Sequence, residues 1–291
     1  MASAPSQLES RRIPAIAWVI ALVVAALLGV AFRQPIARMV EIWNKPESYY
    51  SHGWLVPFVA LFIAWRQRGE LVADPRPSWI GFWTMIAGLL ILIVSGWLIV
   101  GFLPGFGLIL TIWGICGFLL GWTVMKRLWF AAFILCFMVP PPEQFIVQST
   151  LAMKLMATAL AMRLLDLFGI VAVNDGQTIY LGNAFVTVGS ACSGLRSLIS
   201  LIFLGVLFAR FSNLSWPRRI ALAATSIPIA IVSNVARVVS LSLVAYFWGT
   251  NAVSGPVHDA SGYLIFVVAF FLLYGAMWLL QPRRVPKEPA P

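Results

Sequence analysis

The chain alternates long apolar runs with short polar segments. Eight of these runs predict membrane-spanning helices, at residues 14–32, 55–65, 79–100, 105–122, 128–140, 194–209, 220–248 and 263–281. A helix that crosses the ~30 Å hydrocarbon core needs about 20 apolar residues, so the short second and fifth runs leave their ends open. The pattern predicts an all-α polytopic membrane protein, with residues 1–291 forming a single integral membrane domain.

Two segments do not follow the pattern of simple spans. Residues 143–170 are periodic but contain Lys154, Arg163 and Asp166, which suits a helix at the outer interface or packed obliquely better than a clean crossing. The sequence "TIYLGNAFVTV" (Thr178–Val188) alternates β-branched and aromatic residues around Gly182-Asn183, which predicts a β-hairpin. Open hairpin edges are not stable in hydrocarbon, so we expect the hairpin outside the bilayer.

The run at residues 220–248 is too long for a simple crossing. A helix from Ile220 to Trp248 measures ~43 Å at 1.5 Å per residue, compared with a core of ~30 Å. Either the helix extends beyond the core on the outer side, or it breaks near Pro228.

Composition and charge support the membrane assignment. Of 291 residues, 61% are hydrophobic and 10% are charged. A soluble domain of this size cannot bury so much apolar surface. The net charge of +10 comes from basic residues in small groups between the runs, a topology pattern rather than a nucleic-acid surface. Most of the basic residues lie on the cytoplasmic side if both termini are cytoplasmic tails, at residues 1–13 and 282–291. The basic stretch 33–45 opposes this orientation. The first run is expected to be an uncleaved span.

The three cysteines differ in their surroundings. Cys116 and Cys136 lie within apolar runs and are expected to be small core hydrophobes. Cys192 lies in "SACSGLRSL" (190–198), with Ser190 as the predicted N-cap of a helix and the cysteine in its first turn. The helix dipole and Arg196, at i+4 on the same face, then favour the thiolate. The alternative is an inert cysteine capped by neighbouring serines such as Ser193.

Arg237 is a second unusual residue, because it stands in an otherwise apolar helix with Asn234 at i−3. An arginine at mid-helix in lipid costs about 2.5–3.5 kcal/mol on the insertion scale, so it faces the protein interior, for function or for a structural hydrogen bond. Cys192 precedes Arg210, and Arg237 follows Arg219, by eighteen residues each. Both therefore lie ~27 Å above the cytoplasmic arginines, near the outer edge of the core.

The two histidines, His52 and His258, both fall in predicted outer segments. His258 lies in "SGPVHDASGY" just before the last run. A neutral imidazole there can take a proton from a thiol, with Asp259 or a backbone carbonyl to orient it, although a loop histidine is commonly just solvated. A thiol, a base and a cation at one membrane face are what acyl transfer from a peptide requires, and no metal or cofactor is expected.

Four motifs resemble the exosortase/archaeosortase family of membrane cysteine transpeptidases. They are "YYSHGWLVPFVALFIAWRQR" (49–68), "ACSGLRSL", "NVAR" and "HDASGY", in the family's order. The resemblance implies that Cys192 is the nucleophile, Arg237 the transition-state arginine and His258 the base. Arg196 then either holds a carboxylate of the substrate's motif or supports the thiolate. His52 belongs to the first motif but is interpreted mainly as structural.

The resemblance also implies a location and partners. Such enzymes act on C-terminal sorting signals, which consist of a Pro-Glu-Pro-like motif, a transmembrane helix and a basic tail. They pass exported proteins to a surface acceptor, here a polysaccharide or a lipid-linked amine. We therefore expect a multi-pass protein of the bacterial inner membrane with its site facing the periplasm. The alternatives are a non-enzymatic component of exopolysaccharide export or assembly, and a membrane thiol acyltransferase acting on lipid.

Overall fold

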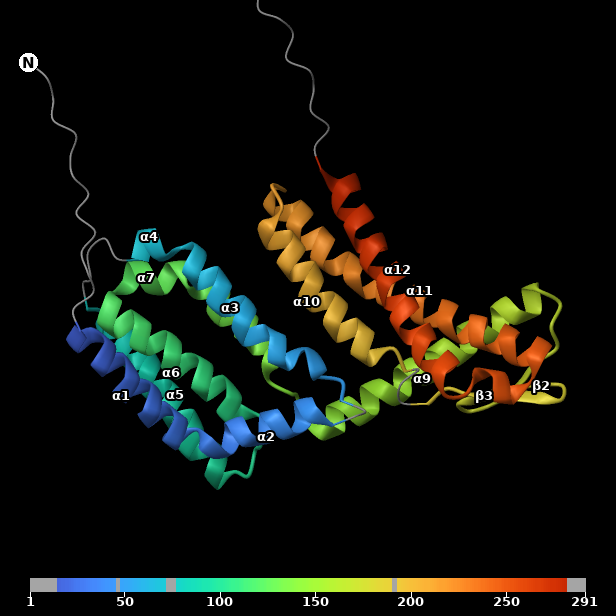
Figure 1. The fold of residues 1–291 in the computed structure, drawn as a ribbon, viewed down its shortest axis with the longest axis horizontal. Helices are drawn as coiled ribbons and strands as arrows, with labels where there is room; N and C mark the ends of the chain where they lie inside the picture. Colours follow the sequence, from blue (N-terminus) through green and yellow to red (C-terminus); the bar gives the residue numbers. More distant parts are fainter. Residues whose placement is uncertain (1–14, 46–47, 72–76, 190–192, 282–291) are drawn as a thin grey trace, which may run out of the picture. The chain divides into compact units, whose positions relative to one another are not determined.

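The computed structural model describes residues 15–45, 48–71, 77–189 and 193–281, and the predicted tails lie outside these ranges. The chain is mostly helical with one small three-stranded sheet (Figure 1). The helices are α1 (Ala15–Ala31), α2 (Arg33–Asn44), η1 (Ser51–Trp54), α3 (Leu55–Arg66), α4 (Arg68–Leu71), α5 (Trp79–Trp97), α6 (Leu103–Leu120), α7 (Trp122–Arg127), α8 (Trp129–Leu135), η2 (Cys136–Met138), α9 (Glu143–Leu167), α10 (Leu195–Phe211), α11 (Trp216–Trp248), η4 (Thr250–Val253) and α12 (Pro256–Leu280).

The prediction of a polytopic helical membrane protein is confirmed, but the count of eight spans is not. Within the described ranges, five helices are long and apolar enough to cross a membrane: α5, α6, α9, α11 and α12. A sixth span is possible if α1 and α2, which meet at a 73° bend, act together. All eight predicted runs contain helix, but α3, α8 and α10 are each shorter than 18 residues. The 25-residue α9 is long enough to cross, whereas the sequence favoured an interfacial position.

The chain forms two compact units, residues 1–40 with 64–132, and residues 41–63 with 133–291. The core of the first unit is the pair α5 and α6. Glycines face each other across this pair, and a Cβ at Gly88 would lie 2.6 Å from the carbonyl oxygen of Gly107. Small residues let two membrane helices approach until their backbones touch, which explains the close contact between α5 and α6.

The second unit contains the sheet together with helices α9, α10, α11 and α12. Strands β1 (Val173–Asp175), β2 (Thr178–Leu181) and β3 (Ala184–Thr187) pair antiparallel in that order. The predicted hairpin is confirmed, because Leu181 pairs with Ala184 across Gly182-Asn183. Strand β1 is an addition that the sequence analysis missed, joined to β2 through Gly176 with a φ of +57°.

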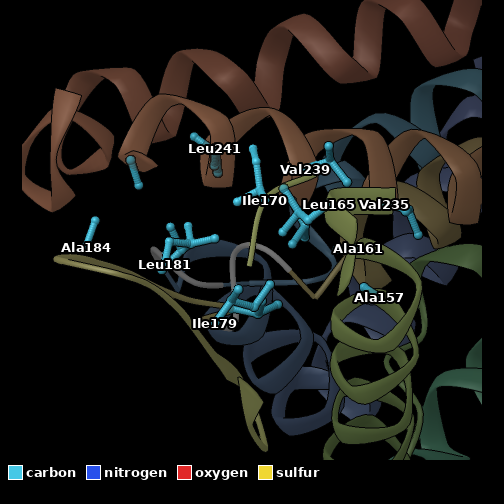
Figure 2. Packing of buried hydrophobic residues seen from close by; sticks show 14 residues of the cluster. Ala157, Ala161, Leu165, Ile170, Ile179, Leu181, Ala184, Val235, Val239 and Leu241 are labelled. Carbon is cyan, nitrogen blue, oxygen red and sulfur yellow. The ribbon is translucent and has the colours of Figure 1, made fainter. Parts of the chain in front are cut away.

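One face of the sheet packs on α9 and α11. Ile179, Leu181 and Val186 point from β2 and β3 into a cluster of buried apolar side chains, which Figure 2 shows together with residues of both helices. The members from the helices include Ala161, Leu165 and the α11 residues 235, 238, 239, 241 and 245. This cluster fixes the sheet against the C-terminal half of α11.

Helix α11 is continuous, with Pro228 inside it. The alternative of a break at this proline is therefore wrong. The 33 residues of α11 measure ~50 Å, which exceeds the ~30 Å core. Part of the helix must extend beyond the hydrocarbon, and the half that carries the sheet, around Val239, is the half toward the predicted outer side.

Candidate active site

A cavity of about 260 Å³ lies where α10, α11 and α12 meet. These helices pack side by side in Figure 1, with α12 in red. The cavity's charged residues are Arg196, Arg237 and Asp259. Its other lining residues are Ser51, Gly194, Ser197, Ser200, Asn234, Gly262, Tyr263, Ile265 and Phe266. The charged residues thus give the lining an excess of positive charge, and hydroxyl and amide groups surround them.

Arg237 is buried, with 7% of its surface exposed, and lines this cavity. Its Nε donates a hydrogen bond to Ser261 Oγ at 3.0 Å, and its Nη2 donates to the carbonyl oxygen of His258 at 3.0 Å. Ser261 Oγ donates to the same carbonyl at 2.6 Å. A guanidinium has five N–H donors in a planar fork, so two bonds to one helical turn fix its orientation. Arg237 of α11 therefore holds the first turn of α12 and presents a cation to the cavity.

His258 lies in that first turn. The prediction of a loop at this residue, before a span that begins at residue 263, is wrong because α12 begins at Pro256. Gly255 ends the preceding segment, and proline suits the first helical position because it lacks the N–H that would be unpaired there. The imidazole is 27% exposed, and its Nδ1 lies 3.3 Å from Asp259 Oδ1. If Nδ1 carries the proton donated to Asp259, Nε2 is the basic nitrogen.

Cys192 and Ser190 lie outside the described residues. The prediction that Ser190 caps the helix is wrong, because α10 begins at Leu195 with Gly194 as its N-cap. Gly194 has a φ of +78°, a left-handed conformation that interrupts a right-handed helix. Cys192 therefore precedes α10, and the helical i+4 relation to Arg196 does not apply.

The chain just after Cys192 nevertheless lies near Arg237. A Cβ at Gly194 would come within 2.5 Å of the Asn234 side chain, and Asn234 is one helical turn before Arg237. Ser193 is fully buried, and its Oγ accepts a hydrogen bond from the Leu195 N–H at 3.3 Å. Gly194 is thus held close to α11, and Ser193, which directly follows Cys192 in the chain, is buried.

The comparisons with known proteins identify the family of the chain. The model of the transmembrane exosortase family (Exosortase_EpsH) matches residues 43–275, a range that includes all the described residues that line the cavity. The chain belongs to the transmembrane exosortase family. No curated protein and no solved structure matches it.

In this exosortase, several site residues were not identified from the sequence. Ser51, Ser197, Ser200 and Tyr263 line the cavity, and Ser261 holds Arg237. Two signals were available: Arg196 and Ser200 are spaced i, i+4, which places them on one helical face, and Ser261 lies within the quoted "HDASGY" motif. Conversely, His258 is not among the described residues that line the cavity, whereas its neighbour Asp259 is.

His52 has no place in the cavity, although Ser51 lines it. Its ring lies 5.4 Å from that of Tyr50 and 6.0 Å from that of Phe203, measured between ring centroids. Burial lowers the pKa of His52 to about 4, with the Phe137 backbone partly opposing the shift. The imidazole is therefore neutral at ordinary pH, and we interpret His52 as a packing residue. Within the described part of the chain, no three His, Cys, Asp or Glu side chains gather as metal ligands.

Gly262 provides a test of how closely Arg237 must be placed. A Cβ at this position would lie 3.1 Å from Nη2 and 3.3 Å from Cζ of Arg237, so the guanidinium would have to shift by a few tenths of an ångström. If Arg237 acts on the substrate, we expect Gly262→Ala to reduce the processing of a sorting signal roughly tenfold, since a small misplacement of such a group is costly. Thermal stability should hold or rise, because alanine favours a helix over glycine.

Gly275→Ala is the matched control, because it lies on the same helix and a Cβ there meets nothing within 4 Å. It should gain the same helix propensity without loss of cleavage. Equal cleavage by the two alanine variants would mean that the position of the guanidinium does not limit the reaction.

Proposed function

We propose that this exosortase is a membrane cysteine peptidase and transpeptidase. Its substrates are the C-terminal sorting signals of exported proteins, and it cleaves them through a thioester at the outer face of the bacterial inner membrane. Family membership supports the processing of sorting signals. The observation that carries the proposal is the buried guanidinium of Arg237, bonded to the helical turn of His258 at a cavity beside the chain that follows Cys192.

The proposed chemistry assigns one task to each of three side chains. Cys192 Sγ forms a bond to the scissile carbonyl carbon, and His258 Nε2 accepts the thiol proton. Arg237 stabilises the tetrahedral oxyanion, an effect that is strongest where water is excluded. The C–N bond then breaks, and the leaving amine takes its proton from His258. Water or an acceptor amine attacks the thioester and returns the thiol.

The length of α11 and the charge at its start support the outer side of the membrane. Arg237 is eighteen residues beyond Arg219 in one continuous helix, a rise of ~27 Å. With the basic end of α11 at the cytoplasm, as the distribution of lysine and arginine favours, the cavity lies near the outer edge of the hydrocarbon core. A sorting signal whose own helix spans the membrane would present its motif at that level.

Substitution of Cys192 tests this function. We expect Cys192→Ala to abolish cleavage of a reporter protein that carries a sorting signal, because neither Cys116 nor Cys136 lines the cavity and so neither can replace the thiol. Cys116→Ala is the control and should cleave normally, since Cys116 lies in α6 of the other unit. The readout is the fraction of processed reporter on a gel.

Cys192→Ser and adduct analysis separate the alternatives. A serine nucleophile should cleave much more slowly, and mass spectrometry of the wild-type protein should find a peptide acyl group on Cys192. A fatty acyl adduct would instead favour the lipid acyltransferase. Normal processing by Cys192→Ala would overturn the proposal and favour a non-enzymatic membrane component.

A further inference from the structure

Arg196 lines the cavity from a different helix than Arg237. It is the second residue of α10 and half-buried, and Ser197 and Ser200 line the cavity from the same helix. Arg237 reaches the cavity from α11 and is bonded to the first turn of α12. The cavity therefore has one cation on the side of the catalytic turn and another on the side of α10.

Two like charges around one small cavity make it attractive for an anion. Charges interact strongly where the surroundings are less polar than water. The aspartate of the lining, Asp259, has a side chain that is 75% exposed, so solvent screens its charge. An anionic group that enters the cavity would meet guanidinium groups that line it from two different helices.

The chemistry of the α10 wall suits a carboxylate. Arginine binds carboxylates in a bidentate geometry that lysine cannot reproduce. Ser197 Oγ already donates to the carbonyl of Gly194 at 2.9 Å, so the hydroxyl of Ser200 is the better placed donor. The cavity of about 260 Å³ is smaller than the roughly 300–1,000 Å³ pockets that hold drug-sized ligands. One acidic side chain with its adjoining backbone fits this volume better than a phospholipid.

We propose that Arg196, supported by Ser200, binds an acidic side chain of the substrate and thereby determines which segment is presented for cleavage. The inference rests on the proposed function, and it assigns a separate task to each arginine. Arg237 acts on the carbonyl that is attacked, whereas Arg196 binds a neighbouring carboxylate. Arg196 is then a specificity residue whose contribution depends on the charge of the substrate.

A charge exchange between enzyme and substrate tests this assignment. The probes are three reporter proteins whose sorting signals carry Glu, Gln or Lys at one motif position. The wild type should lose roughly 10- to 100-fold in kcat/KM between Glu and Gln, the usual range for a hydrogen bond to a charged group, with most of the loss in KM. Arg196→Gln should cleave the Glu and Gln reporters equally. Arg196→Glu should prefer the Lys reporter.

Arg210→Gln is the matched control, because Arg210 lies at the other end of α10, and it should keep the wild-type preference. If Arg196→Gln lowers cleavage of all three reporters by the same factor, Arg196 is structural and the inference is wrong while the proposed function stands. If cleavage instead depends on phosphatidylglycerol in vesicles and not on the reporter's charge, the site binds lipid phosphate and the inference is also wrong. Failure of the proposed function has a different signature, which is normal processing by Cys192→Ala.

Discussion

Replacing Arg237 by methionine is expected to lower kcat for sorting-signal cleavage by about 10²–10³-fold, the usual loss when an oxyanion donor is removed. The protein should keep its fold, because Ser261 Oγ still donates to the His258 carbonyl at 2.6 Å. Methionine has a similar volume and carries no charge, so it removes the desolvation cost of a buried guanidinium but also loses the two hydrogen bonds to the first turn of α12. These two effects oppose each other, and we expect lost activity with a Tm in detergent that changes little.

Two further variants define the cause of that loss. Arg218→Met lies at the exposed basic end of the same helix and should cleave normally. The kcat of Arg237→Lys should lie between those of the wild type and Arg237→Met. An ammonium keeps the charge but lacks the fork that reaches both Ser261 and the His258 carbonyl. A lower Tm together with near-normal cleavage in Arg237→Met would assign this arginine a purely structural role.

Gly194→Ala should have the second large effect, on stability. Gly194 has a φ of +78°, and an added Cβ would lie 2.5 Å from Cγ of Asn234. A left-handed backbone costs an L-residue about 1–2 kcal/mol, and overpacking typically adds about 1–3 kcal/mol. We expect a free energy of unfolding lower by about 2–5 kcal/mol, measured by thermal or denaturant unfolding in detergent, and impaired cleavage because the chain beside Cys192 must move.

Gly189→Ala is the control, because it also replaces a glycine that precedes the site. No atom lies within 4 Å of a Cβ at Gly189, and its φ is not positive. Its stability should stay near wild type. The double variant Gly194→Ala with Asn234→Ala removes the clash, so it should regain the part of the unfolding free energy that overpacking costs. The part that the left-handed backbone costs should stay lost, and the difference from additivity is a measurable coupling energy. Additive effects of the two substitutions would show that Asn234 does not oppose the new Cβ.

Local signals in the sequence explain which elements could be predicted. The alternation around Gly182-Asn183 predicted the hairpin correctly, because a two-residue turn fixes the register on its own. The dipeptide Asp175-Gly176 is also a turn signal, and Gly176-Gln177 forms the two-residue turn between β1 and β2, across which Asp175 pairs with Thr178. Gly255-Pro256 likewise marked the start of α12, which places His258 on a helix.

The start of α10 was mispredicted for a different reason. Ser190 is a good capping residue by type, but the backbone at Gly194 adopts the left-handed conformation, and its close contact with Asn234 leaves no room for a side chain. That contact joins residues 40 apart in the chain, and helical periodicity carries no information about it.

In the candidate site, too, local sequence predicted one residue, whereas its partners depend on how the helices pack. An arginine in an apolar helix was enough to predict that Arg237 faces the interior, since lipid exposure is costly. Its partners Ser261 and the His258 carbonyl are 24 and 21 positions away, and they depend on how α11 packs against α12. The cavity between α10, α11 and α12 is likewise a product of packing, so Ser51 and Ser200 had no recognisable role in the sequence.

The most direct test of the account is an experimental structure of the protein with a sorting-signal segment bound, in which two distances are measured. We predict that Cys192 Sγ lies within about 4 Å of His258 Nε2, since a base must reach the proton that it removes. The scissile carbonyl oxygen should lie about 3 Å from a guanidinium nitrogen of Arg237. A thiol that points away from the cavity between α10, α11 and α12, with the substrate carbonyl out of reach of Arg237, would contradict the account.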